Sequence, residues 1–154
     1  MKKVAKLLCL ISAVVCLAFA LTACGGKSGD KYAYSDTKVS VTGNMPGLSG
    51  AFSGMESAFD NAYKDSEIVV SDSEIEWSFA GQTSTMTIES KDGKDVLGGE
   101  MTERLTQMFA SIGSGNSIAY YGEKTESGYS IILEQIVGAG EYSSTVTTII
   151  NFAK

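Results

Sequence analysis

The chain has 154 residues with 12 basic and 18 acidic side chains, one proline, three cysteines and no histidine. The acidic balance excludes nucleic acid as a partner, because phosphate binding needs clustered cations and the chain has a single arginine. Without histidine the chain lacks the usual general base near neutral pH and the commonest transition-metal ligand. We therefore expect neither a histidine-dependent enzyme nor a metal or other cofactor.

The first residues are typical of a secretory leader. Three lysines and no acidic residue precede an apolar run over positions 7–20, and small residues follow that run. A charged start, an apolar middle and a small-residue end direct a chain to export and are not part of a fold.

A lipid anchor is indicated at the end of this leader. The tetrapeptide Leu-Thr-Ala-Cys at positions 21–24 resembles the lipobox of bacterial lipoproteins. The resemblance implies that residues 1–23 are removed as a signal peptide and that Cys24 receives a diacylglycerol. It also implies attachment to a cell membrane on the extracytoplasmic side, at the cell surface or in the periplasm. The alternatives are an uncleaved anchor and an ordinary signal peptide.

A short tether separates the anchor from the rest of the chain. Residues 24–31 are rich in glycine and charge, so we expect a flexible segment. Residues 32–154 then form a single globular domain. The other two cysteines lie in the leader and Cys24 is expected to carry lipid, so this domain has no disulfide and depends on its apolar core.

The N-terminal half of the domain predicts one helix between strands. Alternating residues predict a strand over 32–43 that ends in a turn at 44–47. The apolar spacing then changes to three and four, which predicts an amphipathic helix over 48–63. Alternation returns over 68–79 and 82–89, which we assign to two further strands.

The C-terminal half begins with a helix and continues as strands. A second apolar stripe predicts a helix over 97–112, closed by the glycine-rich segment 113–116. Three strands follow, over 118–124, 129–137 and 142–152, and short turns join them.

These elements predict an α+β fold. Short connections require antiparallel pairing, so we expect a mainly antiparallel curved sheet of about six strands. Two amphipathic helices with one apolar stripe each would cover one face of that sheet. The alternative is a small lipocalin-like β-barrel with helices that cap it.

Paired acids are the main candidates for catalysis. Glu74 and Glu76 share one face of a predicted strand, and glycosidases use two carboxyl groups at a defined separation. The other face of that strand carries Ile75, Trp77 and Phe79, so the acids are better explained as the solvated side of a half-buried strand. We therefore expect no enzyme activity and assign no catalytic residue.

Aromatic and methionine side chains are the candidates for binding. Tyr120 and Tyr121 are neighbours on one predicted strand, so they must point to opposite faces. Together with Trp77, Phe79 and Met108 they could line a pocket between helices and sheet, or form an exposed patch that meets a partner. The alternative is that these side chains belong to the ordinary core of a two-layer domain.

The whole sequence predicts a membrane-anchored lipoprotein with a non-enzymatic binding module for a small apolar or amphiphilic ligand. The alternative is an envelope protein that acts in protein–protein interaction or assembly. We expect Arg104 to form a surface ion pair first and to contact an anion only second. The ligand, the partner, the oligomeric state and the type of bacterial envelope stay open.

Overall fold

The computed structural model describes residues 28–110 and 117–154. The expected signal peptide, Cys24 and the first tether residues lie outside the described residues, as does the expected helix end at 111–116. The first strand begins at Asp30, which pairs with Val70 of the next strand. The last two residues of the expected tether therefore belong to the folded domain.

The described residues form a sheet of short and long strands with helices inserted between them. In chain order the elements are β1 (Asp30–Gly43), α2 (Leu48–Ala51), α3 (Met55–Tyr63), β2 (Glu67–Val70), β3 (Glu74–Phe79), β4 (Gln82–Lys91), β5 (Lys94–Gly98), α4 (Glu100–Ala110), β6 (Ile118–Lys124), β7 (Gly128–Val137), the 3-10 helix η1 (Gly140–Tyr142) and β8 (Ser144–Ala153).

The predicted α+β class with a mainly antiparallel sheet is confirmed. Each strand pairs antiparallel with the next, and β8 returns to β1, so the ladder closes into a barrel of eight strands rather than an open sheet of about six. The barrel closes because the first and last strands pair, and no local sequence pattern predicts that pairing. A closed barrel with helices was the alternative prediction.

Two strands were missed because their sequences fit other elements. The expected strand over 68–79 is divided by a turn into β2 and β3, with Ser71 bonded to Glu74 across the turn. Residues 94–98 form β5 instead of a turn and the start of the second helix. Asp92 and Gly93 both have positive φ, 52° and 78°, which is the backbone of a two-residue hairpin between β4 and β5.

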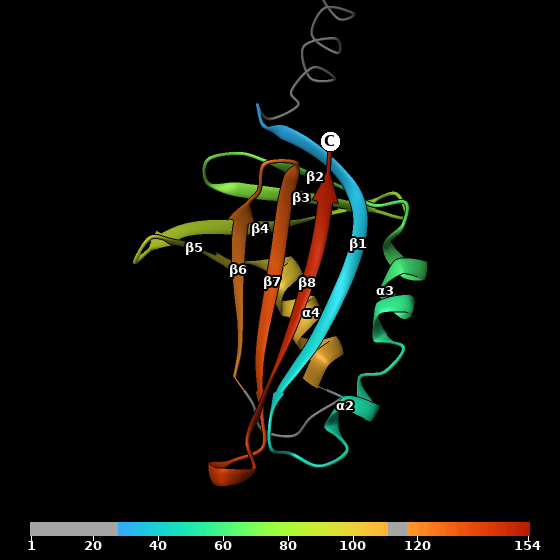
Figure 1. Cartoon of the computed structure of the whole chain (residues 1–154). Helices are drawn as coiled ribbons and strands as arrows, with labels where there is room; N and C mark the ends of the chain where they lie inside the picture. The colour runs from blue at the N-terminus through green and yellow to red at the C-terminus, as the bar shows by residue number, and fades with distance from the viewer. Residues whose placement is uncertain (1–27, 111–116) are drawn as a thin grey trace, which may run out of the picture.

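The barrel consists of two halves joined at narrow corners. One half is β2 to β5, and Figure 1 shows it running crosswise behind β6, β7 and β8. The other half is β6 to β8 with most of β1, in which β1 and β8 stay paired as far as Gly43. At the corners, β1 meets β2 only before Tyr34, and β5 meets β6 only at Asp95 and Val96.

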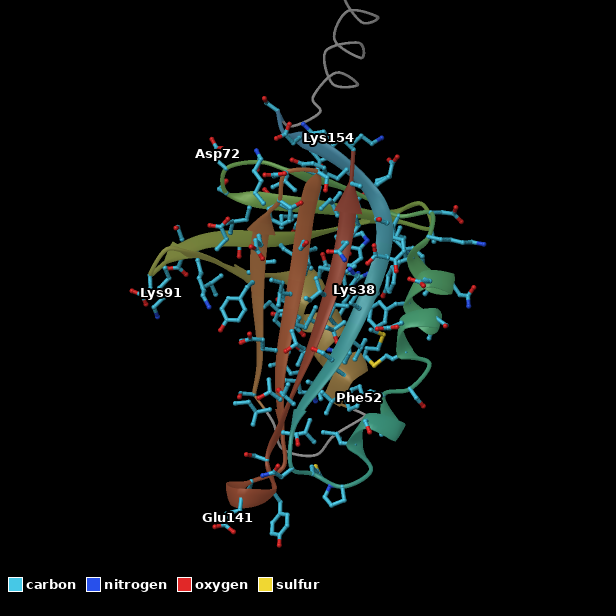
Figure 2. All side chains as sticks on the ribbon, in the orientation of Figure 1. Lys38, Phe52, Asp72, Lys91, Glu141 and Lys154 are labelled. Carbon is cyan, nitrogen blue, oxygen red and sulfur yellow. The ribbon has the colours of Figure 1, made fainter. Side chains whose placement is uncertain are left out.

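The N-terminal segment enters the barrel at one of its two ends. The chain enters at the end that carries Lys154 and Asp72, whereas Glu141 in η1 lies at the opposite end (Figure 2). At the entry end Asp30 receives Lys124 Nζ at 3.1 Å and Lys154 Nζ at 3.7 Å, and these cations lower the pKa of its carboxyl.

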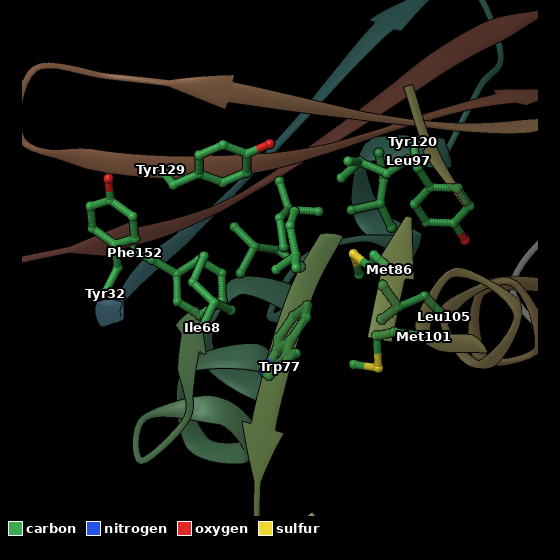
Figure 3. Packing of buried hydrophobic residues seen from close by; sticks show 14 of the residues in the cluster. Tyr32, Ile68, Trp77, Met86, Leu97, Met101, Leu105, Tyr120, Tyr129 and Phe152 are labelled. Atoms are coloured by element: carbon green, nitrogen blue, oxygen red, sulfur yellow. The ribbon is translucent and has the colours of Figure 1, made fainter. Parts of the chain in front are cut away.

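The helices fill the opening that the two halves leave. Phe59 of α3 stacks on Phe109 of α4 with ring centroids 5.8 Å apart, and both rings belong to the main core. The strands contribute fully buried side chains to the same core, and Figure 3 shows part of this packing. These residues are Ile68, Ile75, Trp77, Met86, Ile131 and Ile150. Both expected helices therefore pack on the inner side of the curved sheet.

The first expected helix is divided in two. Gly54 has φ of 83° and is the N-cap of α3, so the chain turns between α2 and α3. Leu48 and Phe52 then form a second small core with Val137 and Val146, away from the main one. Glycine provides the left-handed conformation that the turn needs.

Candidate functional site

A cleft of about 190 Å³ lies between α4 and the hairpin of β3 and β4, and we call it the α4 cleft. The hairpin supplies aromatic and polar side chains, and α4 supplies one continuous face. The lining residues are Tyr63, Trp77, Phe79, Gln82, Ser84, Met101, Arg104, Leu105 and Met108.

Three aromatic rings form one wall of the α4 cleft. The ring of Tyr63, at the end of α3, lies 5.3 Å from Trp77 and 5.0 Å from Phe79 between centroids. Trp77 is 1% exposed and meets Phe152 edge-on at 5.2 Å, so the core fixes this ring. Its buried Nε1–H meets no hydrogen-bond acceptor among the described residues. Phe79 is 38% exposed and forms the outer part of the wall.

The helix α4 forms the opposite wall. Met101 and Leu105 are four residues apart, as are Arg104 and Met108, and the two pairs are adjacent, so all four lie on one face of the helix. Figure 3 shows Met101 and Leu105 projecting from α4 toward Met86 and Trp77 on the sheet. Leu105 is 1% exposed and Met108 is 41% exposed, so the face runs from the core to the surface.

Arg104 is the charged group of the α4 cleft. Its Nη2 donates to Glu100 Oε1 at 2.6 Å, one helical turn earlier, and both side chains are about half exposed. The expected surface ion pair is therefore confirmed. Among the nine lining residues there is no acidic side chain, so the cleft has an apolar floor and Arg104, paired with Glu100, is its one charged lining group.

The structure brings three of the five predicted contact residues together. Trp77, Phe79 and Met108 line the α4 cleft, but Tyr120 and Tyr121 do not. Tyr120 points inward, where its hydroxyl and Thr106 Oγ1 lie 2.8 Å apart, and burial raises the pKa of its phenol. Tyr121 lies on the outside, with Lys94 Nζ 5.3 Å from the ring centroid. The prediction that the two tyrosines face opposite sides is confirmed.

Sequence reasoning missed the other lining residues for different reasons. The face of α4 carried a usable signal, because Met101, Leu105 and Met108 recur at spacings of four and three within the helix predicted over 97–112, and Arg104 lies beside Leu105. Tyr63 fits the apolar stripe that predicts the helix over 48–63, but no local pattern places Tyr63 or Gln82 at this cleft. They reach the cleft because α3 ends beside the β3–β4 turn, which is a tertiary contact.

The described part of the chain offers neither a metal-binding cluster nor a membrane-spanning helix. Residues 28–110 and 117–154 contain no group of three or more histidine, cysteine or acidic side chains placed to hold a metal ion. Over the same residues, no helix has the length and apolar character needed to cross a bilayer.

Comparisons with protein-family models, with curated proteins and with solved structures gave no match to this chain. The function is therefore inferred from the site itself.

Proposed function

We propose that the chain is a membrane-anchored extracytoplasmic lipoprotein whose domain is a non-enzymatic binding module. Its ligand is a small apolar or amphiphilic molecule held in the α4 cleft. The observation that carries this proposal is the convergence of Trp77, Phe79 and Met108, from a hairpin and a helix, on one cleft with an apolar floor. Concave sites with apolar walls and few polar groups are typical of ligand pockets.

The size of the α4 cleft restricts the ligand. A cavity of about 150 Å³ holds benzene, and pockets for drug-sized molecules start at about 300 Å³. At about 190 Å³ the cleft accepts one ring or a short aliphatic segment. The rest of the barrel interior is occupied by side chains that are almost fully buried, such as Ile75 and Ile150.

Binding without catalysis is supported by the residues at hand. The chain has no histidine, and no cysteine or acidic side chain lines the α4 cleft. The hydroxyl groups of this lining belong to Ser84 and Tyr63, and burial raises the pKa of Tyr63, which disfavours its phenolate as a base or nucleophile.

The proposed anchor is tested by Cys24→Ala in the full chain. We expect the precursor to stay uncleaved after Ala23 and to lose the diacylglycerol, which mass spectrometry of the purified protein detects. The domain should keep the circular dichroism spectrum of the parent. A variant that is processed and lipidated like the parent would refute the lipobox assignment.

The proposed ligand is tested by analysis of molecules that copurify with the protein. The parent chain and Phe79→Ala are isolated in parallel from the producing bacterium, and small molecules are extracted and identified by mass spectrometry. We expect at least one molecule with a single ring or short chain to be enriched on the parent, because the variant lacks the outer aromatic wall. Equal extracts from both proteins would count against the cleft as the binding site.

A second candidate function is protein–protein interaction in the envelope. Its support is an exposed apolar group at the barrel end away from the incoming chain, which we call the distal tip: Met45, Ile136 and Tyr142 are 36%, 48% and 69% exposed. They are close in the fold, because Met45 N donates to Ser144 Oγ at 3.0 Å and Ile136 pairs with Thr145. The six residues from Cys24 to the start of β1 span at most about 20 Å. A lipid on Cys24 would therefore hold the entry end of the barrel near the membrane and leave the distal tip facing away from it.

A photo-crosslinking amino acid distinguishes this second candidate. Placed at residue 142 in the distal tip, it should give one discrete crosslinked species in cells if the tip binds a partner. The same group at residue 154, at the entry end, is the control. Equal labelling at both positions would show that the tip has no partner of its own.

A further inference from the structure

We propose that the ligand of the α4 cleft is a carboxylate with a small apolar body, and that Arg104 binds its carboxylate. This inference rests on the proposed function of the same cleft. It is carried by one placement: the single arginine of an acidic chain lies at the rim of a lining that is otherwise uncharged.

The charges around the α4 cleft favour an anion over a cation. Aromatic faces such as those of Tyr63, Trp77 and Phe79 can attract a cation. A cationic ligand would, however, meet the guanidinium of Arg104, because no lining residue is acidic and the nearby carboxylate of Glu100 is already paired with Arg104. A carboxylate meets the reverse situation, with the apolar body against the rings and the charge beside Arg104.

The current partner of Arg104 leaves room for a ligand. One guanidinium nitrogen, Nη2, contacts Glu100 at 2.6 Å. The guanidinium group is a planar fork with five N–H donors and matches the two oxygens of a carboxylate. Both side chains of the pair are about half exposed, and exposed ion pairs contribute little to stability. A ligand carboxylate can therefore share Arg104 with Glu100 or displace it.

The polar side chains of the opposite wall fit the same ligand. Gln82 begins β4 beside the two-residue turn, and Ser84 is inward-facing two residues later. Both line the α4 cleft and can donate hydrogen bonds to oxygen atoms. The cleft thus offers an apolar floor with donors at its edge.

The test uses three probes that share a phenyl ring and differ in charge: phenylacetate, phenylacetamide and phenethylamine. The full chain, labelled with ¹³C-methyl methionine, is reconstituted into phosphatidylcholine nanodiscs, and empty nanodiscs control for partition of the probe into lipid. Met101 and Met108 lie in the cleft and report binding, and Met45 in the distal tip is the internal control. We expect phenylacetate to bind roughly tenfold tighter than phenylacetamide at low salt, and phenethylamine to bind weakest.

Two variants of α4 assign this preference to Arg104. Arg104→Gln should remove the preference for phenylacetate and leave the dissociation constant of phenylacetamide within about twofold. Glu100→Gln should strengthen phenylacetate binding by roughly threefold, because it releases Arg104 from its partner. Glu103→Gln removes the same charge from an exposed residue of the same helix that does not line the cleft, and should change neither value.

The outcomes separate this inference from the proposed function. If Met101 and Met108 report equal affinities for all three probes, or the tightest binding for phenethylamine, the preference for a carboxylate is refuted, while the cleft stays a binding site. A preference for phenylacetate that survives Arg104→Gln would also overturn the inference. If no probe shifts Met101 or Met108, both the inference and the proposed function fail.

Discussion

The two halves of the barrel differ in how their inward-facing side chains are used. In β7 and β8, ten consecutive residue pairs are in register and every second side chain is buried against the interior. In β3 and β4, the inward row runs from the core at Trp77 to the half-exposed Phe79, where it meets α4 and leaves a cleft. The half that contains β7 and β8 is a structural scaffold, whereas the half that contains β3 and β4 contributes both to the core and to the candidate binding site. Substitutions in the two halves should therefore have different effects.

The largest expected difference concerns two glycines. Gly128 in β7 is buried against β8, where a Cβ would overlap the backbone carbonyl oxygen of Phe152. Gly98 in β5 has only the movable Thr87 Oγ1, 3.2 Å from the position of a Cβ. We expect Gly128→Ala to lower the free energy of unfolding by about 3 kcal/mol or more and Gly98→Ala to change it by less than about 1 kcal/mol. Urea unfolding measures both, and similar losses would contradict the division into two halves.

A second comparison truncates one large side chain in each half. Ile150 in β8 is fully buried, so Ile150→Ala should cost about 3 kcal/mol of stability. Phe79→Ala removes a side chain that is 38% exposed and should cost about 1 kcal/mol or less, while it weakens binding in the α4 cleft. Thermal unfolding and probe titration separate the two effects. A Phe79→Ala variant that unfolds as easily as Ile150→Ala would mean that Phe79 belongs to the core.

A third comparison removes one hydroxyl from each of two tyrosines. Tyr34 donates to Asp60 Oδ1 at 2.5 Å and lies 2.7 Å from Thr37 Oγ1, which ties α3 to β1. The hydroxyl of Tyr129 is buried against Gly122 and has no hydrogen-bond partner among residues 28–110 and 117–154. We expect Tyr34→Phe to lower stability by about 1 kcal/mol and Tyr129→Phe to raise it by up to about 1 kcal/mol. Equal losses in both variants would show that the Tyr129 hydroxyl is satisfied in solution.

The same two tyrosines predict a loss of stability at high pH. Burial raises the pKa of Tyr34 to about 12, and its hydrogen bond to Asp60 adds to the shift. Burial also raises the pKa of Tyr129 to about 12, with a smaller contribution from the charge of Asp95. Tyrosines of the unfolded chain lose their protons near pH 10. The stabilising effect is therefore complete below about pH 10 and is lost as the pH rises toward 12.

Urea unfolding across this range tests the pH dependence. The free energy of unfolding of the parent should fall between about pH 10 and 12, and that of Tyr34→Phe should fall less steeply. Parallel curves for the two proteins would show that Tyr34 does not contribute. Ionisation of groups other than Tyr34 is common to both proteins and cancels in this comparison.

How much of the fold the sequence predicts depends on how local each pattern is. The strands around Tyr120, Ile131 and Ile150 follow one another along the chain and are joined by short turns, so their antiparallel pairing can be predicted from the local sequence. Leu97 fits both a strand and a helix stripe, and only its pairing with Ile88 shows that it belongs to β5. Tyr142 fits the alternation of β8, but the chain turns through η1 there and leaves the ring exposed.

The candidate site shows the same limit. The large apolar side chains of Trp77, Phe79 and Met108 make them candidates for ligand contact from the sequence alone, and adjacent positions on one strand place Tyr120 and Tyr121 on opposite faces. Which inward-facing ring lines the α4 cleft depends on where α4 crosses the barrel. That crossing places Thr106 over Tyr120 and leaves the cleft beside Trp77.

The most direct test of the central claim is to locate where a neutral apolar probe binds. Phenylacetamide is titrated into the ¹³C-methyl methionine-labelled full chain in nanodiscs, with each methyl signal assigned by a Met→Leu substitution. We expect saturable shifts of Met101 and Met108, no shift of Met45, and weaker binding by Phe79→Ala. Shifts centred on Met45, or none at Met101 and Met108, would contradict the assignment of the α4 cleft as the binding site.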